Sequence, residues 1–326
     1  MAENSRKIML SGVKPTGRPH IGNYFGAMKQ LVDNQANFRG FIMIADYHAL
    51  IIAQDAQQLR NDIYDLAADY LAIGLDPEKV SIFQQSAITE HTELCWIFNC
   101  LTTVPYLQRA HAYKDAMAKG EEINVGLFDY PILMAADILL YDTDVVPVGQ
   151  DQKQHIEYMR DTAEKFNRIY GETFKLPDGL ILSDVGTLPG LDGRKMSKSY
   201  GNHIPLFAEP AELKKLVMSI QTDSKGVEEP KDPETCNVFA LHKLFSTGEL
   251  DEIRERYLKG GLGYKESKDI LFENMDKYLA PLRERRKEII ADPQKIKDIL
   301  EIGASKAKEV AERKMAEVRK KIGVIL

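Results

Sequence analysis

Short apolar runs alternate with segments of helical periodicity through the first half of the chain. Continuous apolar runs predict strands that are buried on both faces, and they lie at residues 8–10, 40–46, 80–83 and 145–148. Segments 55–74 and 90–104 have apolar residues at three- and four-residue intervals, which predicts helices. Strands and helices that follow one another in this way are typical of a parallel sheet with right-handed crossovers. The first part of the chain is therefore expected to have an α/β fold.

A different pattern follows residue 206. Amphipathic periods without strand-like runs predict helices, at residues 211–220, 236–245, 266–290 and 293–322. We therefore predict an α/β domain over residues 1–206 and an all-helical region over residues 207–326, whose last helix can pack back on the first domain. Within the first domain, residues 105–129 are polar and mixed, which indicates an insertion over the active site.

The stretch from Lys14 to Asn23 lies where the first strand crosses to the first helix. In parallel sheets ligands bind beyond the carboxyl ends of the strands. The start of a helix presents free backbone N–H groups to an anion, and His20 and Asn23 add side-chain donors. Gly22 would let a flat ring or a phosphate approach the backbone. The alternative is an ordinary Gly/Pro loop that opens a structural helix.

A second candidate loop follows about 170 residues later, from Leu191 to Ser199, with the sequence LDGRKMSKS. Lys195 and Lys198 are three residues apart, with hydroxyl residues beside them and a glycine before them. Such a loop suits a mobile clamp for a polyphosphate. Lysine-rich loops are more often solvated surface, so this loop alone leaves both interpretations open.

Taken together, the two loops resemble a pair of motifs found in one enzyme family. His20-Ile-Gly-Asn23 and Lys195-Met-Ser-Lys-Ser199 are similar to the paired motifs of the class I aminoacyl-tRNA synthetases. The resemblance implies a Rossmann-like catalytic domain with an all-helical C-terminal domain. It also implies use of ATP with Mg²⁺ to form an aminoacyl-adenylate, and transfer of the amino acid to tRNA.

The resemblance is closest to the tryptophanyl members of this family, at Tyr130–Tyr141 and Val146–His155. It implies an L-tryptophan pocket formed by Tyr130, Met134, Asp137, His48, Val146, Val148 and Gln152. Indole is a large apolar body with one N–H donor, so a pocket for it needs apolar walls and one acceptor. Asp137 stands in an apolar helix and would accept the indole N–H; the alternative is a solvent-facing helix residue. His48 lines the pocket or is a packed structural histidine.

The family motifs also imply an ATP site. Lys195, Lys198 and His20 are the expected catalytic residues. The expected ATP contacts are Lys14, Pro15, Thr16, Gly22, Asn23, Gly149, Gln150, Asp151, Leu188, Lys195, Met196, Ser197, Lys198 and Ser199. The sequence departs from the family pattern at two of these positions. Position 14 is often Gln in the family and is Lys here, and position 150 is usually Glu and is Gln here.

The composition of the chain indicates where the protein is located and whether it holds a metal cluster. No apolar run approaches the 18 residues of a membrane span, and Met1–Lys7 is too short and polar for a secretion signal, so a cytoplasmic location is expected. Some family members carry an iron–sulfur cluster on four C-terminal cysteines. Cys236 stands alone in that region, so we expect no cluster and no metal site in the protein itself.

The charge distribution along the chain indicates which part can bind the polyanionic tRNA. Net charge is −6, but residues 207–326 hold 24 Lys+Arg against 23 Asp+Glu. We therefore expect the helical region to hold the anticodon stem of tRNA(Trp), with Arg283, Arg285 and Arg286 as candidate contacts. The family resemblance also implies a homodimer and no membrane partner.

Three other functions share part of this sequence pattern. A tyrosyl-tRNA synthetase shares the fold and the outer motifs but normally differs around the helix that carries Asp137. A non-catalytic relative that binds RNA has no need of Lys195, Ser197 and Lys198, which are all present. A small-molecule adenylyl transferase would share the first motif but not the helical C-terminal third.

Overall fold

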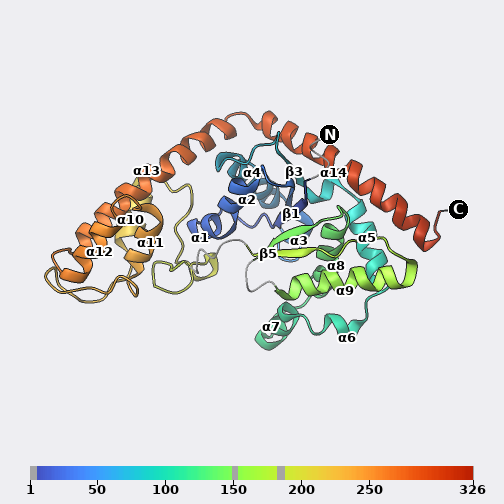
Figure 1. Ribbon diagram of the computed structural model, residues 1–326, viewed down its shortest axis with the longest axis horizontal. Coiled ribbons are helices and arrows are strands. Elements are labelled where there is room, and N and C mark those ends of the chain that lie inside the picture. Colours follow the sequence, from blue (N-terminus) through green and yellow to red (C-terminus); the bar gives the residue numbers. More distant parts are fainter. Residues whose placement is uncertain (1–5, 149–152, 182–187, 326) are drawn as a thin grey trace. The chain divides into compact units, whose positions relative to one another are not determined.

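The computed structural model describes residues 6–148, 153–181 and 188–325 (Figure 1). The chain forms two compact units. The first unit comprises Met1–Gly17, Gln30–Ser183 and Asp292–Leu326, and the second comprises Arg18–Lys29 and Asp184–Ala291. These units are not the predicted functional domains 1–206 and 207–326, which stay a prediction.

A five-stranded sheet forms the centre of the first unit, with the order β3-β2-β1-β4-β5. All four pairings are parallel. The strands are β1 (Ile8–Val13), β2 (Arg39–Ile44), β3 (Val80–Gln84), β4 (Val145–Val148) and β5 (Asp178–Ile181). The chain winds outward from β1 in both directions, which is the doubly wound order of Rossmann-like folds. The predicted α/β class is thus confirmed.

Helices connect and cover these strands. Those of the first unit are α3 (Asp46–Ala49), α4 (Ala56–Ala72), α5 (Glu90–Asn99), α6 (Val104–Leu107), α7 (His111–Lys119), α8 (Val125–Leu139), α9 (Lys153–Tyr170) and α14 (Pro293–Ile322). The segment 105–129, predicted to be loose, contains most of α6, the whole of α7 and the start of α8. Helix α8, which carries Asp137, begins at Val125 because Asn124 caps it, its side chain accepting the Leu127 N–H at 2.8 Å.

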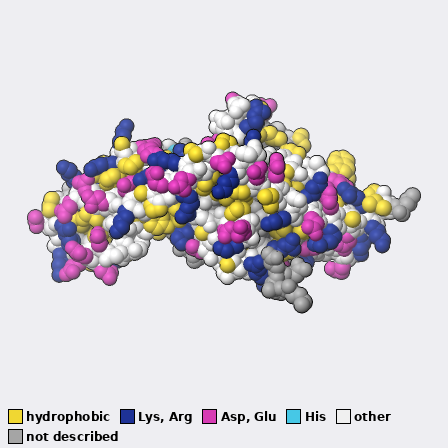
Figure 2. All heavy atoms as spheres, turned by 90° about the horizontal axis from the view of Figure 1, so that it is seen from above, with side chains coloured by type: hydrophobic (Ala, Val, Ile, Leu, Met, Phe, Trp, Pro, Cys, Tyr) yellow, Lys and Arg dark blue, Asp and Glu magenta, His cyan; other side chains and the backbone are white. Residues whose placement is uncertain are grey.

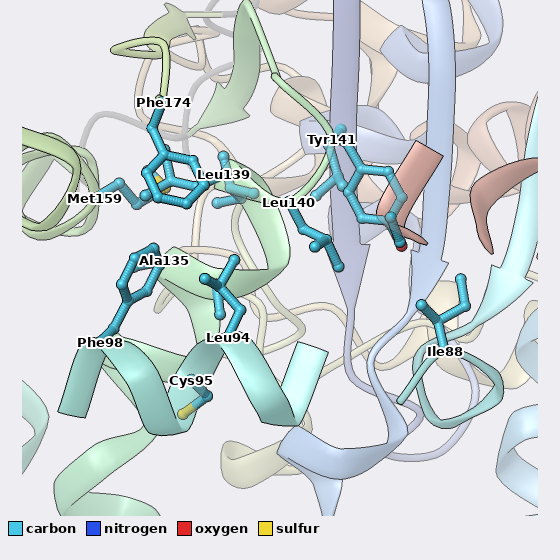
Figure 3. Close-up of a cluster of buried hydrophobic side chains, with 14 of the residues drawn as sticks. Ile88, Leu94, Cys95, Phe98, Ala135, Leu139, Leu140, Tyr141, Met159 and Phe174 are labelled. Carbon is cyan, nitrogen blue, oxygen red and sulfur yellow. The ribbon is translucent and has the colours of Figure 1, made fainter. Parts of the chain in front are cut away.

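The core of the first unit lies between helices and sheet. Figure 3 shows Leu94 and Phe98 of α5 facing Ala135 and Leu139 of α8, with Met159 of α9 beside them. All five side chains are at most 2% exposed. The apolar body of α8 is therefore held on several sides, which fixes the position of the charged residue that it carries.

The last helix, α14, returns to the sheet and packs against β3. Gly303 makes this approach possible, because a Cβ at this position would lie 1.9 Å from the Ile82 carbonyl oxygen. Arg319 near the end of α14 pairs with Glu93 of α5. The close approach of α14 to the backbone of β3 therefore requires glycine at position 303.

The second unit is helical. Its elements are α1 (Ile21–Asn23), a π-helical turn (Tyr24–Met28), the first residue of α2 (Lys29–Asn34), α10 (Pro210–Met218), α11 (Asn237–Phe245), α12 (Leu250–Lys259) and α13 (Tyr264–Ile290). Phe25 explains why residues 18–29 belong here. Its ring lies 5.2 Å from Phe245 of α11 and 5.8 Å from Tyr278 of α13, between centroids.

Two of the three arginines expected to face tRNA are internal to this unit. Arg283 is 4% exposed and donates to Asp276 at 2.5 Å and to the Ala208 carbonyl at 3.2 Å. Arg286 is 8% exposed and its guanidinium lies over the Phe207 ring. The expectation is wrong for these two, because α13 turns them toward the protein. Arg285 is exposed.

The described surface mixes the two signs of charge. On the face in Figure 2, Lys and Arg side chains are interspersed with Asp and Glu, as the modest net charge of −6 suggests. Among the described residues, no helix is both long and apolar enough to cross a membrane.

Candidate active site

The first motif forms a capped helix start in the second unit. His20 is extended, and its Nδ1 accepts the Asn23 N–H at 3.2 Å, while the Asn23 side-chain oxygen accepts the His20 N–H at 3.1 Å. This reciprocal arrangement is a capping box in which histidine replaces the usual Ser or Thr. A short bridge to Pro205 holds the entry, with the Ile21 N–H donating to the Ile204 carbonyl at 3.0 Å.

Gly22 is required at this helix start for a reason that the sequence did not reveal. A Cβ here would lie 2.9 Å from His20 Nδ1 and Cε1, so the ring that caps the helix occupies the space of a side chain. The same Cβ would lie 3.6 Å from Met196 Cβ. The two motifs, far apart in the chain, therefore meet within the second unit.

The second motif is a loop with a buried anchor and exposed lysines. Met196 is 4% exposed, and its N–H donates to the Leu188 carbonyl at 2.9 Å. Lys195 and Lys198 are exposed on either side of it. Ser197 caps a 3-10 turn by accepting the Ser199 N–H at 3.2 Å. The exposed lysines thus stand on a defined backbone.

Asn202 holds this loop together and was not predicted from the sequence. The side chain is 3% exposed; it accepts the Ser197 N–H at 2.9 Å and donates to Asp192 at 2.6 Å and to the Lys195 carbonyl at 3.2 Å. Gly190 makes room for it, since a Cβ there would lie 2.4 Å from the amide. No spacing rule singles out an asparagine that follows a lysine-rich loop.

The cap residue His20 is neutral near pH 7. Burial, together with charge repulsion from the nearby His203 and Lys198, lowers its pKa to about 4. The neutral state suits the cap, because Nδ1 must be unprotonated to accept the Asn23 N–H. The effect of Lys198 also shows that the second lysine of the loop lies close to the first motif.

Lys14, Pro15 and Thr16 belong to the first unit and follow β1 directly. Pro15 is buried, while Lys14 and Thr16 are exposed. The Thr16 N–H donates to the Lys14 carbonyl at 3.0 Å, which makes a tight turn at the carboxyl end of the strand. Gly17 completes the turn with φ 76°.

A buried carboxylate in the first unit is the second candidate site. Asp137 of α8 is 1% exposed, so the solvent-facing alternative is excluded. Its Oδ2 lies 2.7 Å from His48 Nε2, and its Oδ1 accepts a hydrogen bond of 2.7 Å from Gln85 Nε2. His91 Nδ1 also lies 2.7 Å from Oδ1. The carboxylate is thus held by three side chains from other segments.

Asp137 stays ionised in this setting. Burial alone would raise its pKa, but the electrostatic attraction of His91 and the hydrogen bond from His48 outweigh burial and lower the pKa to about 2. An ionised, buried carboxylate costs free energy unless its oxygens are satisfied. The surrounding donors meet that need.

The other predicted pocket residues fall into two groups. His48 is 8% exposed, and its ring lies 6.5 Å from the Tyr130 ring, between centroids. Tyr130 and Met134 are half-buried on α8, and Val146 is 7% exposed on β4. The backbone of Val148 is in β4, but its side chain is not described, and Gly149, Gln150, Asp151 and Gln152 lie outside the described residues. The structure therefore gathers His48, Tyr130 and Asp137.

Three members of the buried network were missed. Gln85, His91 and Tyr141 are all fully buried, and they come from the turn after β3, from α5 and from the end of α8. Gln85 and His91 lie far from Asp137 in the sequence, and Tyr141 lies far from His91, so no local pattern predicts their contacts. Across the residues that the structure describes, no cluster of three or more His, Cys, Asp or Glu side chains could hold a metal ion.

Comparison with known proteins gives consistent matches over nearly the whole chain. A family model described as "tRNA synthetases class I (W and Y)" matches residues 2–280. The tryptophan–tRNA ligase of Fusobacterium nucleatum is 49% identical over 321 residues, which covers 98% of both chains. That of Rhodopirellula baltica is 46% identical and covers 97% of this chain and 99% of its own.

A solved structure matches equally well. The crystal structure of tryptophanyl-tRNA synthetase from Campylobacter jejuni, complexed with ADP and tryptophan, superposes with a TM-score of 0.91 at 46% identity. The match covers 97% of this chain and 99% of that one.

Proposed function

Because the chain belongs to the class I tRNA synthetases of the tryptophan and tyrosine family, we propose that it activates L-tryptophan with ATP and transfers it to tRNA(Trp). The curated relatives at 45–49% identity are tryptophan–tRNA ligases, which decides against the tyrosyl alternative. The observation that carries the choice within the molecule is the ionised, buried Asp137 on an apolar helix.

The reaction has two steps. The carboxylate of tryptophan attacks the α-phosphate of ATP, and pyrophosphate leaves; the resulting adenylate then acylates the terminal ribose of the tRNA. No enzyme nucleophile takes part, so the protein contributes positioning and charge stabilisation. Mg²⁺ would accompany ATP on its phosphates and supply further charge neutralisation.

Lys195 and Lys198 act on the leaving group. Both are exposed on a loop whose backbone is held by Met196 and Asn202. They neutralise the charge that develops on pyrophosphate as it departs. The exposed position of the ammonium groups and the fixed loop backbone support this role.

The other nucleotide contacts lie at the two glycine-rich turns. His20, Gly22 and Asn23 form the capped helix start near Lys198, where neutral His20 and the side-chain-free backbone of Gly22 meet phosphate and adenine. Lys14, Pro15 and Thr16 form the turn after β1, and Leu188, Met196, Ser197 and Ser199 belong to the lysine loop. Gly149, Gln150 and Asp151 would contact the ribose.

The amino-acid pocket uses Asp137 as acceptor for the indole N–H. Met134, Val146 and Val148 supply apolar walls, and Tyr130, His48 and Gln152 supply polar edges. A phenyl ring would leave the buried carboxylate without its partner, and sites of this kind reject such analogues by roughly 10⁴-fold.

The partners beyond the substrates are a tRNA and a second copy of the chain. The helical region from residue 207 holds the anticodon stem, in a cytoplasmic protein. Trp96, Met117 and Val125 of the first unit are 71%, 58% and 79% exposed. The homodimer itself rests on the family resemblance, and light scattering of Trp96→Glu against the unmodified protein would test whether this exposed side chain lies in the interface.

ATP–pyrophosphate exchange measured with each common amino acid tests the function directly. Tryptophan alone should support exchange at micromolar to millimolar concentration. Exchange with tyrosine instead, or with no amino acid, would contradict the proposal.

A further inference from the structure

Among the residues that the structure describes, the side chains around Asp137 do not use all the acceptor positions of its carboxylate. An ionised carboxylate offers about four lone-pair positions. Gln85 takes a position on Oδ1 and His48 takes one on Oδ2, while His91 Nδ1 lies beside Oδ1, each at 2.7 Å. A remaining position is one that an indole N–H can use. Its direction is set by the three donors that surround the carboxylate.

The donors are themselves fixed in orientation. Gln85 Oε1 accepts the Tyr47 N–H at 3.1 Å, so its amide nitrogen must face Asp137. His91 is fully buried, and its Nε2 lies 2.9 Å from the Tyr141 hydroxyl. The His91 ring also stacks on Phe83 at an interplanar angle of 22°. These contacts leave the histidine little rotational freedom.

The hydroxyl of Tyr141 determines which ring nitrogen carries the proton. Burial raises the pKa of Tyr141 well above its ordinary value, and so do the charges of Asp137 and Glu90, so the hydroxyl keeps its proton. When that O–H donates to His91 Nε2, the imidazole proton is on Nδ1, which faces the carboxylate. The Nδ1 contact has an ion-pair distance, although the ring N–H is not aligned for a straight hydrogen bond.

We propose that His91, held by the Tyr141 hydroxyl, is a positioning residue that keeps Asp137 charged and oriented toward a ring N–H, and so sets specificity for tryptophan without touching it. The inference rests on the function proposed above. A chain of buried polar side chains is costly in a core that apolar residues could fill. The position of this chain directly behind Asp137 gives it a role in recognition.

Exchange kinetics with two substrates test the role. One substrate is tryptophan, and the other is its benzothiophene analogue, which lacks the ring N–H. The quantity of interest is the ratio of kcat/KM for tryptophan to kcat/KM for the analogue. A residue that only supports folding would lower both values together, whereas a positioning residue lowers the ratio.

Tyr141→Phe is the mild variant, because it removes one hydroxyl and keeps the ring that packs on Phe41. The ratio should fall about three- to tenfold, mainly through the tryptophan value. His91→Leu should lower it about ten- to a hundredfold, and His91→Asn, which keeps a donor toward Asp137, should recover part of the loss. Tyr70→Phe is the matched control, since Tyr70 is also fully buried but its hydroxyl has no hydrogen-bond partner among the described residues.

An unchanged ratio in Tyr141→Phe would overturn the inference, and so would equal losses for both substrates in His91→Leu. If His91→Leu does not fold, Tyr141→Phe still decides. Failure of the proposed function looks different, because the unmodified protein would then show no exchange with tryptophan. If tryptophan exchange is normal and Asp137→Asn lowers the ratio while the other variants do not, only this inference fails.

Discussion

Replacing Lys195 or Lys198 should slow the formation of the adenylate without weakening the binding of tryptophan. A clamp on the leaving group acts in the transition state and not on the bound amino acid. Lys195→Ala and Lys198→Ala should each slow adenylate formation roughly a hundredfold. The dissociation constant for tryptophan should change by less than about twofold. Pre-steady-state rates and tryptophan binding measured on the same preparations check this, and equal losses in both quantities would exclude the clamp.

Single residues were predictable from sequence only where they belong to a contiguous motif. Lys195 and Lys198 stand in such a motif, but Asn202, which supports the loop, was not anticipated. Asp137 was singled out by the family resemblance of the segment Tyr130–Tyr141, and its place as a lone charge in an apolar helix supported that interpretation. Its partners Gln85 and His91 were missed, since they join it only through the fold. The reason for Gly22 was also missed, because it depends on where the His20 ring lies.

Among the elements, α13 changes the expectation for tRNA binding. Arg283 and Arg286 are buried, so Arg283→Ala should destabilise the second unit by about 3 kcal/mol, since it leaves Asp276 without its partner. Arg285→Ala should leave stability unchanged and lower tRNA affinity, with a smaller salt slope. Urea unfolding measures the stability of both variants, and filter binding at several salt concentrations measures their affinity for tRNA. An unchanged affinity and slope for Arg285→Ala would remove α13 from the tRNA contact.

Helix α14 depends on Gly303 for its place on the sheet. Gly303→Ala puts a methyl group against the Ile82 carbonyl oxygen and should destabilise the first unit by about 3 kcal/mol or more. Ser305→Ala, at an exposed position of the same helix, is the control and should be neutral within about 0.5 kcal/mol. Similar unfolding midpoints for the two variants would mean that α14 can shift along β3 without cost.

Periodicity predicted the long elements well and the short ones poorly. The apolar runs of β2, β3 and β4 and the amphipathic repeats of α4, α13 and α14 are strong signals. Strand β5 was not predicted, because Asp178 and Gly179 make up half of it. Helix α12 was missed because its sequence is dominated by charge and only Ile253 and Tyr257 are buried. The break between α5 and α6 was also missed.

For the whole molecule, the partition of the chain into units could not be read from the sequence. Residues 18–29 follow β1 directly, yet they belong to the unit that contains 184–291. Phe25 and the bridge between His20 and Pro205 hold them there. Such long-range contacts leave no local pattern, whereas the change from strands to helices near residue 206 does.

Two buried histidines should make the second unit sensitive to acid. Burial lowers the pKa of both His20 and His242 to about 4, against 6.5 in an unfolded chain. Between these pH values the unfolded state binds more protons, so stability falls as pH falls from 6.5 toward 4. Each histidine should remove about 2 kcal/mol by roughly pH 5. Asp137 adds nothing to this loss, since its pKa is about 2.

Urea unfolding at several pH values measures this slope. His242→Asn should make the slope shallower, while His111→Asn, at an exposed position, should leave it unchanged. A slope in His242→Asn equal to that of the unmodified protein would show that His242 does not carry the effect.

The central claim is that Asp137 selects the amino acid, and Asp137→Asn tests it most directly. The variant keeps the size and one acceptor oxygen but loses the charge, and charge-assisted hydrogen bonds are about twice as strong as neutral ones. We predict that kcat/KM for tryptophan falls about ten- to thirtyfold in pyrophosphate exchange, or about 1–2 kcal/mol, while the benzothiophene analogue gains relative to tryptophan. An equal fall for both substrates would contradict the claim and make Asp137 a structural residue.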